Sequence, residues 1–343
     1  MNVLLTSSGR RTYLVEYFRK ALGGKGLVFA SNSMQSPAMA CADGCGISPL
    51  IYSEEYIPWL LEFCRKNSIG LIVPLFDIDL PVLAEHREQF ENEGITVAVS
   101  GAETVRTASD KLAMSRRLQE AGIGCPGCTA DPEEARKLLE AGALRWPVVI
   151  KPRFGCGSIG LFTAEDPEEL QVLYRKCARK VAESYLKYES APHAGRDVLI
   201  QELQQGTEYG LDVICDFAGQ YRTTVVRRKV MMRSGETDEA VILGNGDGAY
   251  EALTDLGKKL AQLFDIRGNM DVDVMLDLAD GIPQVIDINA RFGGGYPFSH
   301  MAGVDLPKAY VAWAQGQKEP AGCLEAAAGV HGYKDIAMKV YGE

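Results

Sequence analysis

The sequence predicts an α/β protein in which an open parallel α/β domain precedes a two-lobed α+β domain. Apolar strand-like runs alternate with amphipathic helix-like runs over residues 1–105, at the spacing of a parallel sheet. From about residue 106 this alternation stops, and past residue 206 strand-like runs dominate. A chain of 343 residues also exceeds one ordinary core. We therefore expect three units, at 1–105, 106–205 and 206–343.

In the first unit, helix-like runs separate the strand-like runs. The expected strands are 2–6, 26–32, 69–76 and 95–101, and the expected helices are 12–22, 56–68 and 79–94. Open parallel sheets bind ligands beyond the carboxyl ends of their strands. The polar residues expected at that edge are Ser7, Ser8, Gly9, Arg10, Arg11, Asn32, Asp77 and Asp79.

The remaining units follow a different order of elements. Ser109 is the expected N-cap of the first helix, because a serine hydroxyl satisfies an exposed backbone N–H. The expected elements are helices at 109–122, 131–142 and 167–188, strands at 146–155 and 160–164, a polar loop at 189–196, two strands around Gly206 within 197–216, and then mostly strands with one helix near 248–265.

Composition and charge narrow the class of protein. The chain is 46% hydrophobic and 24% charged, which indicates a soluble globular protein. Its net charge of −10 speaks against a general nucleic-acid or membrane-surface binder, since both need clustered positive charge. No apolar run reaches the ~18 residues of a membrane span. The first residues lack the basic segment of a signal peptide, so we expect a cytoplasmic protein.

The nine cysteines are expected to be reduced thiols, because their number is odd and no export signal accompanies them. Cys125 and Cys128 form a C-x-x-C motif, which in other contexts binds zinc or carries redox chemistry. Neither a thioredoxin-like context nor a second pair of ligands accompanies the motif. A turn that holds two thiols is therefore the expectation here.

Residues 155–160, Gly-Cys-Gly-Ser-Ile-Gly, match G-x-G-x-x-G, a pattern typical of dinucleotide-binding proteins. That function requires a helix directly after the loop, so that the pyrophosphate meets the helix N-terminus. Here a short β-like run follows, and the order is strand, glycine loop, strand. Such a hairpin can cover nucleotide phosphates, as the glycine-rich loop of kinases does, with Lys151 within reach of a phosphate. A plain surface hairpin is the alternative.

Acidic residues alternate along the run 270–277. Asp271, Asp273 and Asp277 lie on one face, because side chains two apart on a strand point the same way. The valines and leucine between them form an apolar face. The acidic face is thus expected to meet a cleft or solvent, and plain solvation suffices for Asp277.

The expected hairpin to the next strand brings two carboxylates together. A three-residue loop, 279–281, pairs Leu278 with Ile282, and the same register places Asp273 opposite Asp287. Facing carboxylates repel each other unless a cation lies between them. The sequence therefore predicts a site for Mg²⁺, which prefers oxygen ligands.

The polar face continues past Asp287 and then loses its side chains. Asn289 and Arg291 follow at alternate positions, and Gly293–Gly295 come next. We expect Asn289 to supply a third oxygen ligand and Arg291 to bind the phosphate that the metal does not neutralise. The glycines let a substrate approach the backbone.

The flap lysine, the acidic strand pair and the D-x-N-x-R run stand in an order that resembles the ATP-grasp superfamily, specifically its carbamoyl-phosphate-synthase-like carboxylate–amine ligases. The likeness extends from LLTSSGRRTYLV through VVIKPRFGCGSIG to VIDINARFGGGYP. It implies a pre-ATP-grasp domain at 1–105 followed by an ATP-grasp domain. It also implies ATP and Mg²⁺, or Mn²⁺ in its place, and a homodimer as the assembly.

The same resemblance implies roles for the matching residues. Lys111 and Lys151 contact ATP phosphates, with Lys111 also near the adenine, and Lys151 and Arg291 act in catalysis. The family often has Glu where Asp287 stands. The implied metal ligands are Asp273, Asp287 and Asn289. The further nucleotide contacts implied are Gly155, Gly157 and Ser158 in the flap, Glu202, Leu203 and Gln204 in the adenine hinge, and Glu208 at the ribose.

Four residues are expected to contact the substrate. Arg10 follows the first strand and a glycine turn, and its charge adds to a helix N-terminus already suited to anions. Arg228, Gly294 and His300 lie in or beside segments expected to shape the acceptor pocket. A plain surface pair is the alternative for Arg10 with Arg11, and packing is the alternative for His300.

The implied activity is that of an ATP- and Mg²⁺-dependent ligase. A small-molecule carboxylate attacks the γ-phosphate, and a small-molecule amine then displaces phosphate from the acyl phosphate. A carbamoyl phosphate synthase large subunit repeats this module and this chain has it once, which speaks against carbamoyl phosphate synthesis itself. Carbamoyl-phosphate-type synthesis from bicarbonate is kept as an alternative. A non-catalytic nucleotide sensor on the same fold is another. A nicotinamide-dependent oxidoreductase is a third, which the missing helix after Gly160 disfavours.

Overall fold

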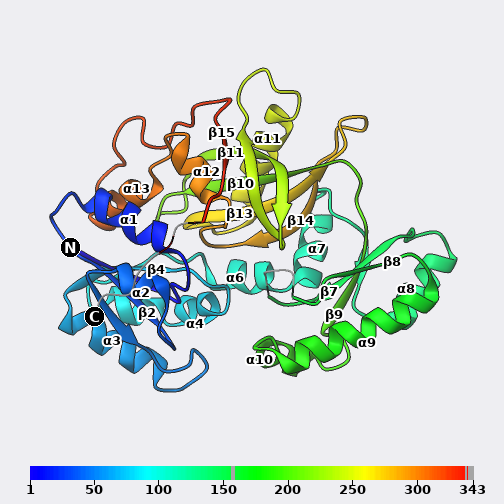
Figure 1. Cartoon of the computed structure of the whole chain (residues 1–343), viewed down its shortest axis with the longest axis horizontal. Helices are drawn as coiled ribbons and strands as arrows, with labels where there is room; N and C mark the ends of the chain where they lie inside the picture. Colours follow the sequence, from blue (N-terminus) through cyan, green and yellow to red (C-terminus); the bar gives the residue numbers. More distant parts are fainter. Residues whose placement is uncertain (156–158, 337, 339–343) are drawn as a thin grey trace.

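A computed structural model of the chain describes residues 1–155, 159–336 and 338. It contains three β-sheets, each built from one stretch of the sequence, with helices packed against them (Figure 1). The predicted fold class, a parallel α/β domain followed by a two-lobed α+β domain, is confirmed. No helix in the described part of the chain is both long enough and apolar enough to cross a membrane.

The N-terminal sheet has the strand order β3-β2-β1-β4-β5, and all of its pairs are parallel. Its strands are β1 (Asn2–Thr6), β2 (Val28–Asn32), β3 (Gly44–Ile47), β4 (Ile69–Pro74) and β5 (Thr96–Val97), and its helices are α1 (Thr12–Leu22), α2 (Pro37–Cys41), α3 (Tyr56–Lys66), α4 (Asp79–Glu85) and α5 (Arg87–Glu91). The helix predicted over 79–94 is divided at His86, whose ring nitrogen bonds the Val82 carbonyl at 2.8 Å. Sequence inspection missed α2 and β3, which are short and only partly buried.

A smaller lobe follows, with a four-stranded sheet of order β6-β9-β7-β8 (Figure 1). The linking helices are α6 (Ala102–Ser109) and α7 (Lys111–Glu120). The lobe comprises β6 (Cys128–Thr129), α8 (Pro132–Glu140), β7 (Val148–Pro152), β8 (Phe162–Ala164), α9 (Pro167–Glu183), α10 (Lys187–Ser190), the 3-10 turn η1 (Ala191–His193) and β9 (Val198–Glu202).

Two boundaries in this region differ from the prediction. The N-cap of α7 is Asp110 rather than Ser109, because the Asp110 carboxylate accepts from the backbone N–H groups of Leu112 and Ala113. The long helix ends at Glu183, where Ser184 leaves the helical conformation and its hydroxyl bonds the Val181 carbonyl at 3.1 Å.

The third sheet is antiparallel and has the order β14-β13-β10-β11-β12-β15. Its elements are β10 (Thr207–Cys215), β11 (Tyr221–Arg233), β12 (Glu236–Ile242), α11 (Tyr250–Leu263), β13 (Gly268–Leu276), β14 (Gln284–Asn289), α12 (Tyr296–Met301), α13 (Leu306–Ala314) and β15 (His331–Tyr333). The sequence predicted one helix here, and the structure adds α12 and α13. Both contain a proline in their first turn, which suits a helix start but interrupts an amphipathic pattern.

The register of the β13–β14 hairpin is as predicted at the acidic residues but not at the turn. Asp273 pairs with Asp287, and Asp271 pairs with Asn289. Between them and the turn the register shifts by one residue, with Val274 opposite Val285. The loop is longer than the predicted 279–281, and a bulge compensates, since one extra residue in a strand restores the faces beyond it.

Hydrophobic packing joins the N-terminal domain and the large sheet but leaves the smaller lobe with its own core. One cluster combines Leu4 and Phe90 with Leu211 and Val272, and a second combines N-terminal and C-terminal side chains in the same way. The smaller lobe has a separate cluster around Ile150. The cavity described next lies at this boundary.

Candidate active site

A cavity of about 600 Å³ lies between the smaller lobe, the large sheet and the loop after β1. Most of the predicted site residues line it, although they come from two parts of the chain, 106–205 and 206–343. The predicted residues that line it are Lys111, Lys151, Gly155, Glu202, Leu203, Gln204, Glu208, Asp273, Asp287, Asn289, Arg291 and Gly294. Gly157 and Ser158, predicted nucleotide contacts in the flap, lie outside the described residues.

One wall of the cavity is the polar face of β13 and β14. The paired positions Asp273 with Asp287 and Asp271 with Asn289 place four oxygen-bearing side chains together at the end of the hairpin. Each side chain stands on a regular ladder, so their spacing is set by backbone hydrogen bonds. This wall carries the negative charge of the site.

Two lysines face that wall from the other side. Lys111 Nζ lies 3.1 Å from Asp287 Oδ1 and donates to the Gly155 carbonyl at 2.6 Å. Lys151 Nζ donates to the Ile286 carbonyl at 3.2 Å. Burial lowers the pKa of Lys151 to about 8, an effect that Asp287 partly offsets. The two ammonium groups therefore hold the smaller lobe to the acidic hairpin.

The residues present suit a hard divalent cation. Asp273, Asp287 and Asn289 offer only carboxylate and amide oxygens, the donors that Mg²⁺ prefers. Among the described residues, no group of three or more acidic, His or Cys side chains is arranged as a metal site. Asn289 is not an acid, and two of the carboxylates are instead paired with lysines. The donor chemistry fits the metal, and the ligand roles stay a prediction.

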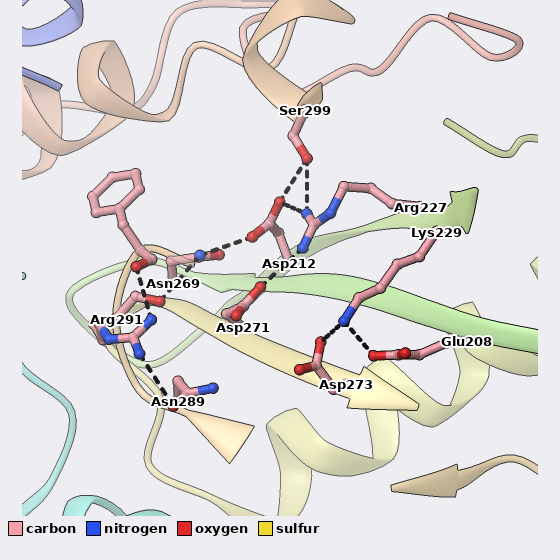
Figure 2. Close-up of polar contacts among 11 residues, drawn as sticks. Glu208, Asp212, Arg227, Lys229, Asn269, Asp271, Asp273, Asn289, Arg291 and Ser299 are labelled. Carbon is pink, nitrogen blue, oxygen red and sulfur yellow. Dashed lines mark hydrogen bonds and ion pairs between the residues drawn. The ribbon is translucent and has the colours of Figure 1, made fainter. Parts of the chain in front are cut away.

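Lys229 is a site residue that the sequence prediction missed. Its Nζ lies 2.6 Å from both Glu208 and Asp273, so one buried cation joins the predicted ribose acid to a predicted metal ligand (Figure 2). These two partners raise the pKa of Lys229 against the opposing effect of burial. These two carboxylates therefore favour the charged form of Lys229.

Behind this wall lies a fully buried charge cluster centred on Arg227 (Figure 2). Its guanidinium pairs with Asp212 and, at 2.9 Å, with Asp271, and it donates to the Ser299 hydroxyl at 3.0 Å. Asn269 donates to Asp212 at 2.9 Å. Burial raises the pKa of Asp271 to about 7, with a further contribution from neighbouring Asp273. A buried charge that is paired and hydrogen-bonded on every side fixes its surroundings.

Arg291 is held at the junction of two domains. Its guanidinium lies 2.8 Å from Asp77 Oδ2 of the N-terminal domain, and it donates to Asn289 Oδ1 at 3.2 Å and to the Phe292 carbonyl at 3.0 Å. Asp77 follows β4, at the carboxyl edge of the parallel sheet where the sequence indicated a ligand site. That edge therefore faces the end of β14.

The loop after β1 meets the cavity through a different arginine from the predicted one. Arg11 lines the cavity, whereas the Arg10 side chain is 86% exposed and lies 3.9 Å from Glu236 at the rim. Ser7 and Gly9 in this turn have positive φ angles. The predicted substrate residue Arg10 thus lies outside the cavity, and Arg11 is the arginine of this turn that lines it.

Two other predicted substrate contacts lie elsewhere. Arg228 is exposed, because β11 alternates and directs Arg227 and Lys229 toward the cavity. His300 stacks on Tyr17 with ring centroids 3.6 Å apart, and burial lowers its pKa. His300 is thus a packing residue between α1 and α12, the alternative that the sequence left open.

The opposite end of the cavity is formed by the predicted adenine hinge. Glu202, Leu203 and Gln204 line it, and the Glu202 amide donates to the Gly127 carbonyl within the C-x-x-C turn. Cys125 contacts Ser115 at 3.5 Å and Cys128 pairs with Gln201 across β6 and β9. Burial raises the pKa of Cys128. Both thiols are free and pack behind the hinge, as expected of a turn that holds two thiols.

Comparison with known families agrees with this arrangement. Residues 108–295, more than half of the chain, match the family described as "ATP-grasp domain", and residues 3–98 match "PylC-like, N-terminal domain". Carbamoyl phosphate synthase large chains are similar in sequence. That of Thermotoga neapolitana is 23% identical over 260 residues, 74% of this chain and 22% of that protein. That of Pyrococcus furiosus is 24% identical over 272 residues, 75% and 24% respectively.

Solved structures of similar fold include biotin carboxylase from Campylobacter jejuni, with a TM-score of 0.74, 18% identity, and coverage of 95% of this chain and 73% of that one. L-amino acid ligase from Bacillus licheniformis has a TM-score of 0.68, 18% identity, and coverage of 95% and 77%. At such identity the likeness shows the fold. The chain spans about a quarter or less of the length of the two sequence relatives described above.

Proposed function

Because this chain belongs to the ATP-grasp family, we propose that it is an ATP- and Mg²⁺-dependent ligase that joins a small carboxylate to an amine. The observation that carries the proposal is the cavity between the smaller lobe and the large sheet. There two lysines from one side meet an acid–amide–arginine wall from the other. Phosphoryl transfer needs such an arrangement, since the protein's task is to position groups and to neutralise spreading charge.

The order of residues along the cavity supports nucleotide binding. The hinge Glu202–Gln204 would offer backbone groups to adenine, and Glu208 would bind the ribose hydroxyls. Three lysines converge at the other end, where the phosphates would lie, namely Lys111, Lys151 and Lys229. Their present oxygen partners occupy places that phosphate oxygens and a cation would share. Gly155 and the flap would cover the phosphates.

Asp273, Asp287 and Asn289 would hold Mg²⁺, and Mn²⁺ suits the same oxygen donors. When bound, the metal would supply charge neutralisation at the transferred phosphate. Lys229 already balances Asp273 and Glu208 in the structure, and Lys111 balances Asp287. These contacts keep the acidic wall assembled.

The carboxylate of the substrate attacks the γ-phosphate, which gives an acyl phosphate and ADP. An amine then attacks the acyl carbon and phosphate leaves. Arg291 lies at the end of β14 where it would bind the transferred group, with a planar fork suited to two phosphoryl oxygens. Arg11 and Gly294 line the end of the cavity that remains for the acceptor. We further propose that the protein is a homodimer and that it is located in the cytoplasm.

Two other functions fit the same fold. A nucleotide sensor needs ATP binding alone, and the concentration of charge at the phosphate end speaks against it, because binding does not require groups that act on the transferred phosphate. Carbamoyl-phosphate-type synthesis uses bicarbonate as the acceptor. It therefore needs only a small space for the acceptor beside the nucleotide. The three functions differ in the compound that ATP consumption requires: an organic carboxylate for the ligase, bicarbonate for the carbamoyl-phosphate type, and none for the sensor, which does not consume ATP.

The test is ADP formation by the purified chain with MgATP and a panel of carboxylates, with and without amines and with bicarbonate as a separate arm. Dependence on an organic carboxylate is the expected result. Dependence on bicarbonate alone would replace the main proposal by its alternative. Tight ATP binding without ADP formation in every arm would support the sensor.

A further inference from the structure

A charged contact joins the N-terminal domain to the end of β14. Asp77 Oδ2 lies 2.8 Å from the Arg291 guanidinium, and both side chains are buried. The two residues are 214 positions apart in the sequence and belong to different domains. An ion pair that is largely withdrawn from solvent is sensitive to the loss of either partner.

Two further guanidinium hydrogen bonds of Arg291 have partners close in sequence. It donates to Asn289 two residues before it and to the Phe292 carbonyl directly after it. These partners lie on the same short stretch, which ends in three glycines. Asp77 is a carboxylate of another domain that lies 2.8 Å from the same guanidinium.

A second aspartate of the same loop shows what a purely structural role looks like. Asp79 is fully buried and accepts from the Tyr56 hydroxyl at 2.6 Å, inside the N-terminal domain. Asp77 and Asp79 both follow β4, and both are buried. They differ in direction, since Asp79 faces its own domain and Asp77 faces Arg291.

We propose that Asp77 is a positioning residue for Arg291, so that the N-terminal domain takes part in phosphoryl transfer by orienting the guanidinium over the transferred group. This inference rests on the proposed ligase function. A guanidinium bound on one edge by a carboxylate keeps its remaining N–H groups directed away from that edge. Misplacement of such a group by about 1 Å can cost about 100-fold in rate.

The experiment compares Asp77→Asn and Asp77→Ala with Asp79→Asn, using the carboxylate that supports ADP formation in the wild-type chain. For Asp77→Asn we expect kcat to fall about 10- to 100-fold and the KM for ATP to stay within about twofold, together with a lower melting temperature, because one partner of a buried ion pair is lost. Asp77→Ala should lose at least as much. Asp79→Asn should lower the melting temperature and leave kcat near the wild-type value.

A double-mutant cycle then tests whether Asp77 acts through Arg291. In the Arg291→Lys background, Asp77→Asn should cost much less than it costs alone, because the group that it positions is already replaced. Wild-type kcat in both Asp77 variants would overturn the inference, and so would a parallel fall of kcat, ATP affinity and melting temperature. A wild-type chain without ADP formation would overturn the proposed function instead.

Discussion

The smaller lobe and the rest of the molecule are built differently, although the cavity lies between them. The N-terminal domain and the large sheet share continuous cores, whereas the smaller lobe packs around Ile150 on its own. Helix α7 connects the two, since Met114 joins the shared core while Leu112 packs with Leu199 of the lobe. Two units with separate cores and one connecting helix can change their distance without disturbing either core.

The boundary between these units also passes through the charges of the site. The large sheet carries Asp273, Asp287 and Lys229, with Arg291 directly after β14, whereas Lys111 and Lys151 come from the start of α7 and from β7. Aromatic pairs add to this contact, with Tyr52 against Tyr188 at 4.8 Å between the N-terminal domain and α10. We expect the large sheet to be the fixed half of the site and the smaller lobe, with its own core, to be the half that moves.

The largest effect is expected from the fixed acidic wall. Asp287→Asn and Asn289→Ala should each lower ATP turnover by about 10²–10³-fold, because the first removes a negative charge and one carboxylate oxygen and the second removes an amide oxygen where charge develops. The measurement is the initial rate of ADP formation in Mg²⁺. Asp277→Asn is the matched control, since Asp277 directly follows β13 but is exposed and lies outside the cavity. Wild-type rates for both site variants would contradict the metal assignment.

Arg291→Lys is expected to cost about 100-fold, mostly in kcat. A point charge cannot replace a planar fork on phosphoryl oxygens, and the contact strengthens as charge develops on the transferred group. Steady-state kinetics with varied ATP separates the two parameters. Arg228→Lys, an exposed change on β11 of the same sheet, should be neutral. Equal losses in ATP affinity and in rate would instead mark Arg291 as a ground-state contact.

Core substitutions test whether the two halves are independent. Ile150→Ala and Leu211→Ala remove similar buried volume, each at a cost of about 2–5 kcal/mol to the unit that contains it. Hydrogen exchange should rise throughout β7–β9 for Ile150→Ala, and across the parallel sheet and the large sheet for Leu211→Ala. A rise over the whole chain for Ile150→Ala would show that the smaller lobe has no separate stability.

The smallest effect is expected from Glu189 of α10, where the lobe meets the N-terminal domain. Burial, with Asp77 next in importance, raises the pKa of Glu189 to about 7, against the opposing effect of Lys111. The folded state therefore favours the protonated form, so this contribution to stability is complete below about pH 4.5 and is lost as the pH rises through 7. Between pH 6 and 8 the melting temperature should fall by about 1–2 °C more in the wild type than in Glu189→Gln. Identical pH profiles would show that Glu189 does not titrate at this contact.

The comparison between the halves also separates what the sequence could predict from what it could not. Strand runs of the parallel sheet, the glycine flap and the facing pair Asp273 and Asp287 follow from local patterns. The Asp273–Asp287 pairing was predicted from a shorter loop, and a bulge in β14 produced the same register. Local sequence patterns are enough to predict a strand or a hairpin pairing, because residues close in the sequence determine these features.

Contacts between residues far apart in the chain could not be predicted from the sequence. In the run Arg227-Arg228-Lys229 three cations are adjacent, and only the facing strands decide that the first and third enter the site. The choice between Arg10 and Arg11 depends on positive φ angles in the turn. The contact of Asp77 with Arg291 depends on how two domains dock. None of these leaves a periodic pattern in the chain.

The most direct test of the ligase activity traps the acyl phosphate. The chain is incubated with MgATP, the carboxylates of the panel and hydroxylamine, and ADP and hydroxamate are measured together. The expected result is carboxylate-dependent ADP formation with an equal amount of hydroxamate, lost in Asp287→Asn. Binding of MgATP in the cavity with no hydroxamate from any carboxylate would contradict carboxylate activation by this protein.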